Sequence, residues 1–187
     1  MPVSKIHQRP IGIFDSGLGG LTVAKAILKL LPQEDIVYFG DTARVPYGTK
    51  SKDSIIRFSL QNADVLMERQ VKAIVVACNS SSSYALPALK RYVKVPVLGV
   101  IGPGVRKALA MTRSGRVGIV ATPATVNSGA YQKQLLKQRS TCKISAQACP
   151  LFVPLVEEGW LERGVTVSVA QEYLRPIQKA GVDTLIL

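Results

Sequence analysis

Cysteine and histidine are scarce in this sequence, which has three cysteines and one histidine among 187 residues. The cysteines, Cys78, Cys142 and Cys149, are odd in number and lack the spacing typical of metal ligands. The histidine, His7, lies in a polar leader. A zinc site or a scaffold of disulfides is therefore not expected.

Long hydrophobic runs are also missing. No apolar stretch approaches the ~20 residues that cross a bilayer. The opening segment, MPVSKIHQRP, lacks the apolar core of a secretion signal. We therefore expect a soluble, cytoplasmic protein with no membrane partner. Because 47% of the residues are hydrophobic, the chain can bury a sizeable core, as one large domain or two small ones.

Acidic residues are half as frequent as basic ones, 12 against 24, which gives a net charge of +12. Clustered Lys and Arg side chains would favour binding to nucleic acid. Here the basic residues are spread over helix-length segments, with no dense run and no stacking aromatic motif. Solvated helix faces explain this pattern, and a nucleic-acid partner is not expected.

Short apolar runs alternate along the chain with longer amphipathic ones. The expected strands are 11–16, 35–41, 73–79, 95–101, 116–122, 143–149 and 182–187. The expected helices are 21–31, 51–70, 83–92, 103–112, 125–139 and 167–180. This alternation predicts βαβ units, and hence an α/β fold with mostly parallel sheets flanked by helices. The segment GVIGPG, 99–104, favours a boundary between two lobes, residues 1–100 and 101–187.

The ends of parallel strands are where ligands bind in such folds. At the first end, Asp15 and Ser16 precede a glycine-rich turn that matches neither a dinucleotide-binding loop nor a P-loop. This segment suits a small charged ligand, although Asp15 could simply cap the next helix. At the second end, Asp41 precedes a stiff turn, residues 46–48, and then a helix for which Ser51 is the candidate N-cap.

Cys78 ends the third strand, directly before Asn79 and a run of serines. The amino end of a following helix would favour the thiolate and lower the pKa of Cys78, which would suit an acid/base or a nucleophile. A small buried hydrophobe is the alternative. The fourth end, at Cys149, leads through an apolar turn with two prolines to Glu157 and Glu158, either of which could face a site or water.

Six segments carry a family resemblance: IFDSGLGGLTVAKAI, DTARVPYG, VVACNSSS, PVLGVIGPG, ATPATVNSGAY and ACPLFVPLVEEG. In this order they closely resemble the glutamate racemases, of the cofactor-independent aspartate/glutamate racemase family. The resemblance implies two similar α/β lobes with the active site in the cleft between them. It also implies a homodimeric isomerase without cofactor, which interconverts L- and D-glutamate and supplies D-glutamate for peptidoglycan, cell wall biogenesis and cell shape.

The resemblance also assigns the residues of the site. Cys78 would be one of two cysteine acid/bases, acting on the D enantiomer, with Asp15 beside it and Glu157 near the opposite cysteine. The expected substrate-binding residues are Asp15, Ser16, Pro46, Tyr47, Gly48, Asn79, Ser80, Thr122 and Thr125. Ser80 stands where the family usually has threonine, so the hydroxyl is kept and a methyl group is lost.

Racemisation needs an acid and a base on opposite faces of Cα. In the family the second cysteine follows a strand resembling VDTLIL, where this sequence stops at Leu187. Cys149 matches a different family segment, and Cys142 lies at the amino end of a strand. We therefore expect that the C-terminal portion is missing and that this chain is poor or inactive in racemisation. The alternatives are an aspartate racemase and a non-catalytic relative that binds amino acids or associates with DNA.

Overall fold

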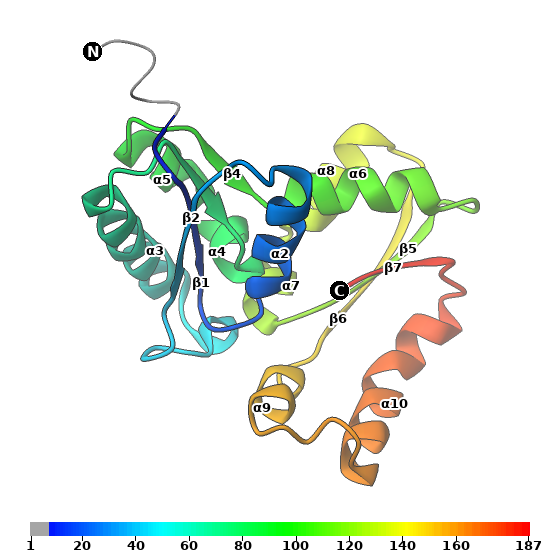
Figure 1. Ribbon diagram of the computed structural model, residues 1–187. Helices are drawn as coiled ribbons and strands as arrows, with labels where there is room; N and C mark the ends of the chain where they lie inside the picture. The colour runs from blue at the N-terminus through cyan, green and yellow to red at the C-terminus, as the bar shows by residue number, and fades with distance from the viewer. Residues whose placement is uncertain (1–7) are drawn as a thin grey trace. The chain divides into compact units, whose positions relative to one another are not determined.

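The computed structural model describes residues 8–187, which leaves His7 outside the described part (Figure 1). The chain divides into two compact units, with the boundary between Val100 and Ile101. Each unit contains a parallel sheet flanked by helices, which confirms the α/β class expected from the sequence. Within residues 8–187, no helix is both long enough and apolar enough to cross a membrane.

The first unit is built on a four-stranded parallel sheet in the order β2-β1-β3-β4. Its strands are β1 (Ile11–Asp15), β2 (Ile36–Gly40), β3 (Ala73–Val76) and β4 (Val97–Gly99). Its helical elements are α2 (Leu21–Leu30), the 3-10 turn η1 (Tyr47–Thr49), α3 (Lys52–Glu68), α4 (Asn79–Tyr84) and α5 (Leu86–Tyr92). Because the strands are parallel, their carboxyl ends share one edge of the sheet.

Successive side chains of β1 point to opposite faces of this sheet. Phe14 is fully buried in a core with Leu66 of α3 and Leu89 of α5, whereas Ile13 packs with Ala24 of α2. Figure 1 accordingly shows α2 and α3 on opposite sides of β1. Fully burying a side chain such as Phe14 contributes about 1.5–3 kcal/mol, so β1 anchors the layers on both faces.

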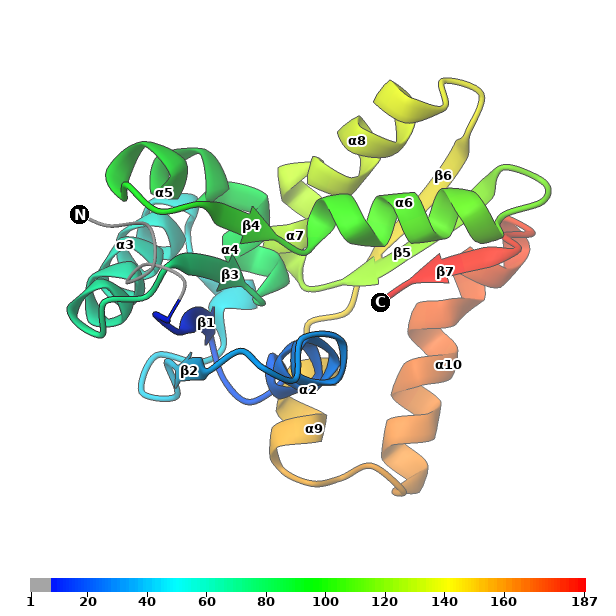
Figure 2. The same cartoon turned by 45° about the horizontal axis from the view of Figure 1, so that its top comes forward.

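The second unit contains a three-stranded parallel sheet in the order β6-β5-β7. Its strands are β5 (Arg116–Ala121), β6 (Lys143–Ala148) and β7 (Thr184–Ile186). Its helices are α6 (Ile101–Met111), α7 (Pro123–Ser128), α8 (Ala130–Gln138), α9 (Phe152–Glu157) and α10 (Gly164–Lys179). Helices α6 and α8 pack on the face that carries Ile119, and α10 packs on the face that carries Val120 (Figure 2).

All the strands expected from the sequence are present, each shorter than expected at one or both ends. Ser51 is the N-cap of α3, as predicted, because its hydroxyl oxygen accepts a hydrogen bond from the backbone N–H of Ser54 at 3.2 Å. Helix α6 already begins at Ile101, earlier than the expected start at residue 103.

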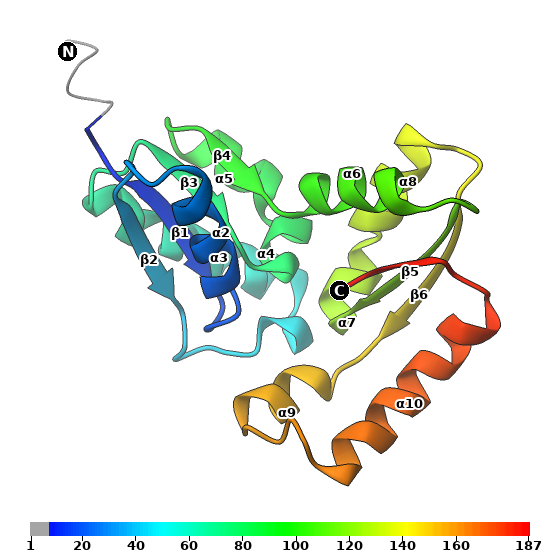
Figure 3. The same ribbon diagram turned by 45° about the vertical axis from the view of Figure 1, so that its right-hand side comes forward.

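Several helix boundaries differ from the expected ones. The helix expected at 83–92 begins at Asn79 and is divided into α4 and α5. The helix expected at 125–139 is divided by Gly129, whose φ of +64° glycine adopts readily. The helix expected at 167–180 begins at Gly164. The segment expected as an apolar turn after Cys149 contains a short helix, α9, which follows β6 (Figure 3).

Candidate active site

The carboxyl edge of the first sheet brings together polar residues at the ends of three strands. Asp15 ends β1, Asp41 directly follows β2, and Cys78 follows β3. Since β1 lies between β2 and β3 in the sheet, these residues belong to adjacent strands. The sequence alone predicts this gathering, because chemistry-bearing residues stand where buried strands end.

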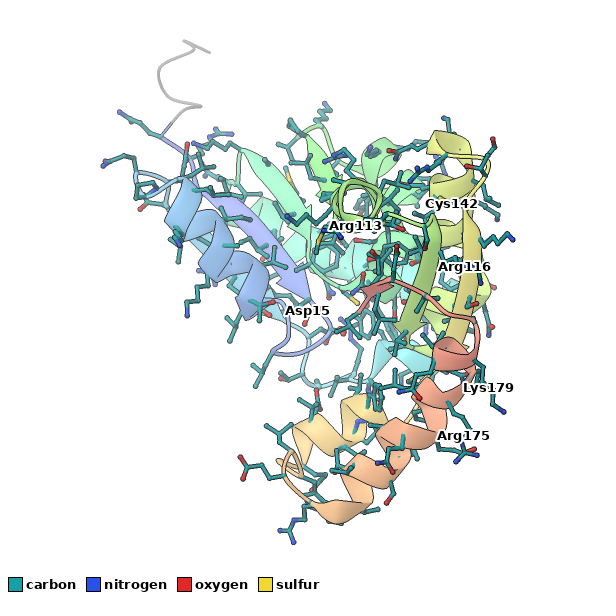
Figure 4. The ribbon with its side chains drawn as sticks, turned by 90° about the vertical axis from the view of Figure 1, so that its right-hand side faces the viewer. Asp15, Arg113, Arg116, Cys142, Arg175 and Lys179 are labelled. Carbon is teal, nitrogen blue, oxygen red and sulfur yellow. The ribbon has the colours of Figure 1, made fainter. Side chains whose placement is uncertain are left out.

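Asp15 organises the glycine-rich turn at the end of β1 (Figure 4). Its Oδ2 accepts hydrogen bonds from the backbone N–H groups of Gly17, at 3.2 Å, and Gly20, at 3.0 Å. Gly20 is the N-cap residue of α2. Asp15 therefore supports the start of that helix, which agrees with the capping role considered for it in the sequence. A Cβ atom on Gly20 would lie 2.7 Å from the Cβ of Asp15, which explains the glycine there.

Cys78 does not belong to β3, contrary to the expectation from the sequence. It is the N-cap residue of α4, and its sulfur accepts a hydrogen bond from the backbone N–H of Ser81 at 3.5 Å. The same sulfur lies 3.5 Å from the hydroxyl oxygen of Ser16, within hydrogen-bonding distance for sulfur. Asn79, also expected in the strand, is the first residue of α4. The thiol is therefore held between two loops at one edge of the sheet.

Burial raises the pKa of the Cys78 thiol, and the negative charge of Asp15 raises it further. The hydrogen bonds with Ser16 and Ser81 act in the opposite direction but do not reverse the shift. The expected lowering of this pKa is therefore wrong, because desolvation and a nearby carboxylate outweigh the local helix terminus. Burial and the Asp15 carboxylate thus favour the neutral thiol of Cys78 over the thiolate.

The serine run after Cys78 is packed into the unit. The hydroxyl groups of Ser81 and Ser59 lie 3.0 Å apart, which links α4 to α3. The hydroxyl of Ser82 donates to the carbonyl of Val76 at 2.8 Å and accepts from the N–H of Val100 at 3.2 Å. The side chains of residues 80–82 are all buried. The serines that follow the candidate thiol are thus held in place by buried hydrogen bonds.

The turn after β2 contains the three residues expected to line the pocket. Tyr47 and Gly48 are buried within η1, and Pro46 is its N-cap residue. The hydroxyl of Tyr47 donates to the carboxylate of Asp41 and accepts a hydrogen bond from Nδ2 of Asn62 at 3.1 Å. Burial first, and then the hydrogen bond with Asp41, raise the pKa of Tyr47 well above its usual range. Asn62 lies inside α3, where no signal in the sequence marks it.

In the second unit, Thr122 and Thr125 lie at the carboxyl end of β5. Thr122 is the N-cap residue of α7, and its hydroxyl oxygen accepts from the N–H of Thr125 at 3.4 Å. The two hydroxyl oxygens lie 3.2 Å apart. Glu157 is the last residue of α9, and its side chain is exposed to solvent.

The other two cysteines lie at opposite ends of β6. Cys149 follows the carboxyl end, is 1% exposed, and has a pKa that burial raises to about 11. Cys142 precedes the amino end and is also buried. Residues 8–187 contain no group of three or more His, Cys, Asp or Glu side chains arranged to hold a metal ion.

Comparisons with a family model and with known proteins indicate the same family. Residues 11–187 match the model of the Asp/Glu/hydantoin racemase family. The glutamate racemase of Geobacter metallireducens is 54% identical over 179 residues, which are 96% of this chain and 66% of that protein. That of Aquifex pyrophilus is 56% identical over 177 residues, with 95% and 68% covered. The chain thus spans about two thirds of the length of these relatives.

Solved structures agree with this result. The glutamate racemase of Francisella tularensis, solved with D-glutamate, has a TM-score of 0.90 and 43% identity, with 97% of this chain and 68% of that chain covered. An aspartate racemase of Picrophilus torridus has a TM-score of 0.62 at 18% identity, covers 96% of this chain and 80% of its own, and shares the fold alone. The chain belongs to the Asp/Glu/hydantoin racemase family, and it is similar over nearly all of its length to glutamate racemases.

Proposed function

We propose that the protein takes part in the cofactor-independent interconversion of L- and D-glutamate, with Cys78 as one of the two acid/bases of the reaction. One observation carries the proposal: the Cys78 sulfur lies at the same sheet edge as Asp15 and within 3.5 Å of the Ser16 hydroxyl. A thiol in such a place can exchange a proton with a small charged substrate. The solved relative that holds D-glutamate supports glutamate as that substrate.

The chemistry fits the electrostatics of Cys78. A thiolate removes the Cα proton, the thiol keeps it, and the electron pair left at Cα spreads into the adjacent carboxylate. Because the pKa of Cys78 is raised, a nearby positive charge would favour formation of its thiolate. The ammonium group of an amino acid, held beside Asp15, would offset the negative charge that raises the pKa of Cys78. Substrate binding would thereby generate the base.

The remaining site residues position the substrate in this proposal. Ser16, Asn79, Ser80, Thr122 and Thr125 would hold its carboxylates or its amine, and the turn of Pro46, Tyr47 and Gly48 would line the pocket. Ser80, which stands where the family usually has threonine, is 3% exposed. The missing methyl group therefore belongs to a buried segment, the serine run after Cys78. Glu157 would assist the second acid/base.

The second acid/base has no convincing candidate among the other cysteines. Cys142 lies before β6, at the edge opposite the strand ends that carry Thr122. Cys149 is 1% exposed, and its segment resembles a family segment other than the one that carries the second cysteine. We therefore propose that this polypeptide by itself exchanges the Cα proton of one enantiomer and is poor or inactive in racemisation.

The family context extends the proposal beyond the site. The product D-glutamate would serve peptidoglycan synthesis, and hence cell wall biogenesis and cell shape. The protein would act in the cytoplasm as a homodimer. No feature of the described residues favours DNA association over this role.

Protection of Cys78 from alkylation tests the proposal. Iodoacetamide labelling at pH 9 is followed at each cysteine by mass spectrometry, with D-glutamate, D-aspartate or neither amino acid present. We expect D-glutamate to slow the labelling of Cys78, and D-aspartate to do so less, with Cys142 and Cys149 as internal references. Equal labelling of Cys78 in all three samples would contradict the proposal. Stronger protection by D-aspartate would identify an aspartate racemase instead.

A further inference from the structure

Four polar side chains, from the turn after β2 and from α3, form a closed ring of hydrogen bonds and an ion pair. Tyr47 donates to the carboxylate of Asp41, and Nε of Arg44 pairs with the same carboxylate at 2.7 Å. Nη2 of Arg44 donates to Oδ1 of Asn62 at 3.1 Å, and Nδ2 of Asn62 donates to the hydroxyl of Tyr47 at 3.1 Å. We call these four residues the Tyr47 ring.

The Tyr47 ring is charged, and three of its four residues are buried. Asp41 is 4% exposed, Tyr47 is 1% exposed, and Asn62 is fully buried. A buried carboxylate is tolerated only when it is paired and hydrogen-bonded, so the loss of one partner leaves the others unsatisfied. Arg44 also stacks over the ring of Phe58, with 4.4 Å from its guanidinium carbon to the ring centroid. This arrangement fixes the residues in one geometry.

The Tyr47 ring is connected to both sides of the candidate site. The backbone N–H of Asp41 donates to the carbonyl of Asp15 at 2.9 Å. On the other side, η1 contacts α4, the helix that Cys78 caps. The turn of Pro46, Tyr47 and Gly48 is therefore held between the loop of the candidate carboxylate and the helix of the candidate thiol.

We infer that Asp41, Arg44 and Asn62 are positioning residues, which act through Tyr47 to fix the turn 46–48 for substrate. The inference rests on the proposed function, because it assumes that this turn lines the glutamate pocket. The alternative is that the Tyr47 ring only stabilises the first unit. The two roles differ in one respect: only a positioning role changes substrate affinity in a chain that remains folded.

Arg44→Lys and Arg57→Lys are a matched pair that separates these roles. Both arginines lie over Phe58, with 4.4 Å and 5.3 Å from guanidinium carbon to ring centroid, but only Arg44 belongs to the Tyr47 ring. Lysine keeps the charge yet cannot bond Asp41 and Asn62 together through a planar guanidinium. Arg44 is partly exposed, with 30% of its side chain accessible, so the variant is expected to fold.

The experiment measures two quantities on the whole polypeptide: D-glutamate affinity by calorimetric titration, and hydrogen exchange at the Lys50 amide. This amide reports on the turn because it donates to the carbonyl of Tyr47 at 3.0 Å. For Arg44→Lys we expect about tenfold weaker binding, equivalent to ~1.4 kcal/mol, and faster exchange at Lys50. For Arg57→Lys we expect neither change.

Two results would overturn the inference. One is unchanged affinity in Arg44→Lys despite faster exchange at Lys50, which would assign the Tyr47 ring a stabilising role only. The other is equal behaviour of the two variants. If the unmodified polypeptide binds no D-glutamate, the proposed function fails separately. Unchanged exchange at Lys50 in Arg44→Lys would still overturn the inference in that case, because the Tyr47 ring would then not fix the turn.

Discussion

The backbone N–H of Ser81 donates a hydrogen bond to the sulfur of Cys78, 3.5 Å away, so the candidate acid/base is also the cap of α4. A thiol in a strand would point to one face of the sheet and be fixed by packing alone. As a cap, Cys78 is instead held at the carboxyl edge by hydrogen bonds that form on both sides of it. The sulfur of Cys78 therefore both caps α4 and serves as the candidate acid/base.

The pKa of Cys78 should depend on Asp15. Burial raises this pKa first and the Asp15 carboxylate second, so Asp15→Asn removes one cause and should shift the pH profile of Cys78 alkylation to lower pH. Cys149 serves as an internal reference, because burial alone raises its pKa to about 11. A profile that stays in place or moves to higher pH in Asp15→Asn would contradict this electrostatic account.

Gly20→Ala should destabilise the first unit. The new Cβ would lie 2.7 Å from the Cβ of Asp15 and 2.9 Å from that of Ala77, so packed atoms must move. We expect a loss of about 1–3 kcal/mol in the free energy of unfolding, measured with urea. Gly19→Ala is the matched control, because within residues 8–187 its Cβ would come within 4 Å of Oδ2 of Asp15 alone, at 3.7 Å. Equal stability of the two variants would be the opposing result.

Ser82 and Ser83 should respond differently to replacement by alanine. Ser82→Ala removes hydrogen bonds to the carbonyl of Val76 and from the N–H of Val100, with an expected loss of about 1–3 kcal/mol in the free energy of unfolding. The buried hydroxyl of Ser83 has no hydrogen-bond partner within residues 8–187, so Ser83→Ala should be neutral or slightly stabilising. Urea unfolding compares the two, and a larger loss in Ser83→Ala would be inconsistent with this packing.

Asp183 should make the second unit sensitive to acid. Its carboxylate accepts from the Thr112 hydroxyl at 2.6 Å and from the N–H groups of Ser114, at 2.7 Å, and Arg113, at 2.9 Å. These bonds, that from Thr112 first, hold the pKa of Asp183 well below its usual range. The lowered pKa means that the stabilisation is fully present above the unfolded-state pKa of about 3.9, begins to decline below it, and is lost as the pH falls through the lower folded-state pKa.

Asp183→Asn tests this assignment. Thermal unfolding between pH 7 and pH 3 should show a lower midpoint for the variant at pH 7, with the difference shrinking as the pH falls. Asp64→Asn is a control on the first unit, because Asp64 is exposed and accepts a hydrogen bond from the exposed Tyr92. A constant difference across the pH range would exclude the carboxylate of Asp183 as the cause.

The sequence predicts the edge where the candidate site forms, because apolar runs and the residues that end them are local signals. Asp15, Asp41 and Cys78 follow from those signals. The start of α4 does not, since serines next to a strand usually favour turns and caps over helix interiors. The helical start is stabilised because buried hydrogen bonds to α3 and to the ends of β3 and β4 satisfy the hydroxyl groups of Ser81 and Ser82.

Two features of the site depend on contacts that are distant in the sequence. The raised pKa of Cys78 comes from burial and from Asp15, which lies 63 residues earlier, whereas the local helix end alone indicates the opposite shift. Arg44 and Asn62 look like ordinary surface residues in the sequence. Their role in the Tyr47 ring becomes visible only when α3 packs beside the turn after β2.

The most direct measurement is Cα hydrogen exchange in D2O, followed by NMR with D-glutamate and L-glutamate supplied separately. The polypeptide is compared with Cys78→Ser and with Cys142→Ser as the matched control. We predict deuterium incorporation into D-glutamate without inversion, lost in Cys78→Ser and retained in Cys142→Ser. Exchange that persists in Cys78→Ser would contradict the assignment of Cys78, and inversion of both enantiomers would show that this polypeptide already contains a second acid/base.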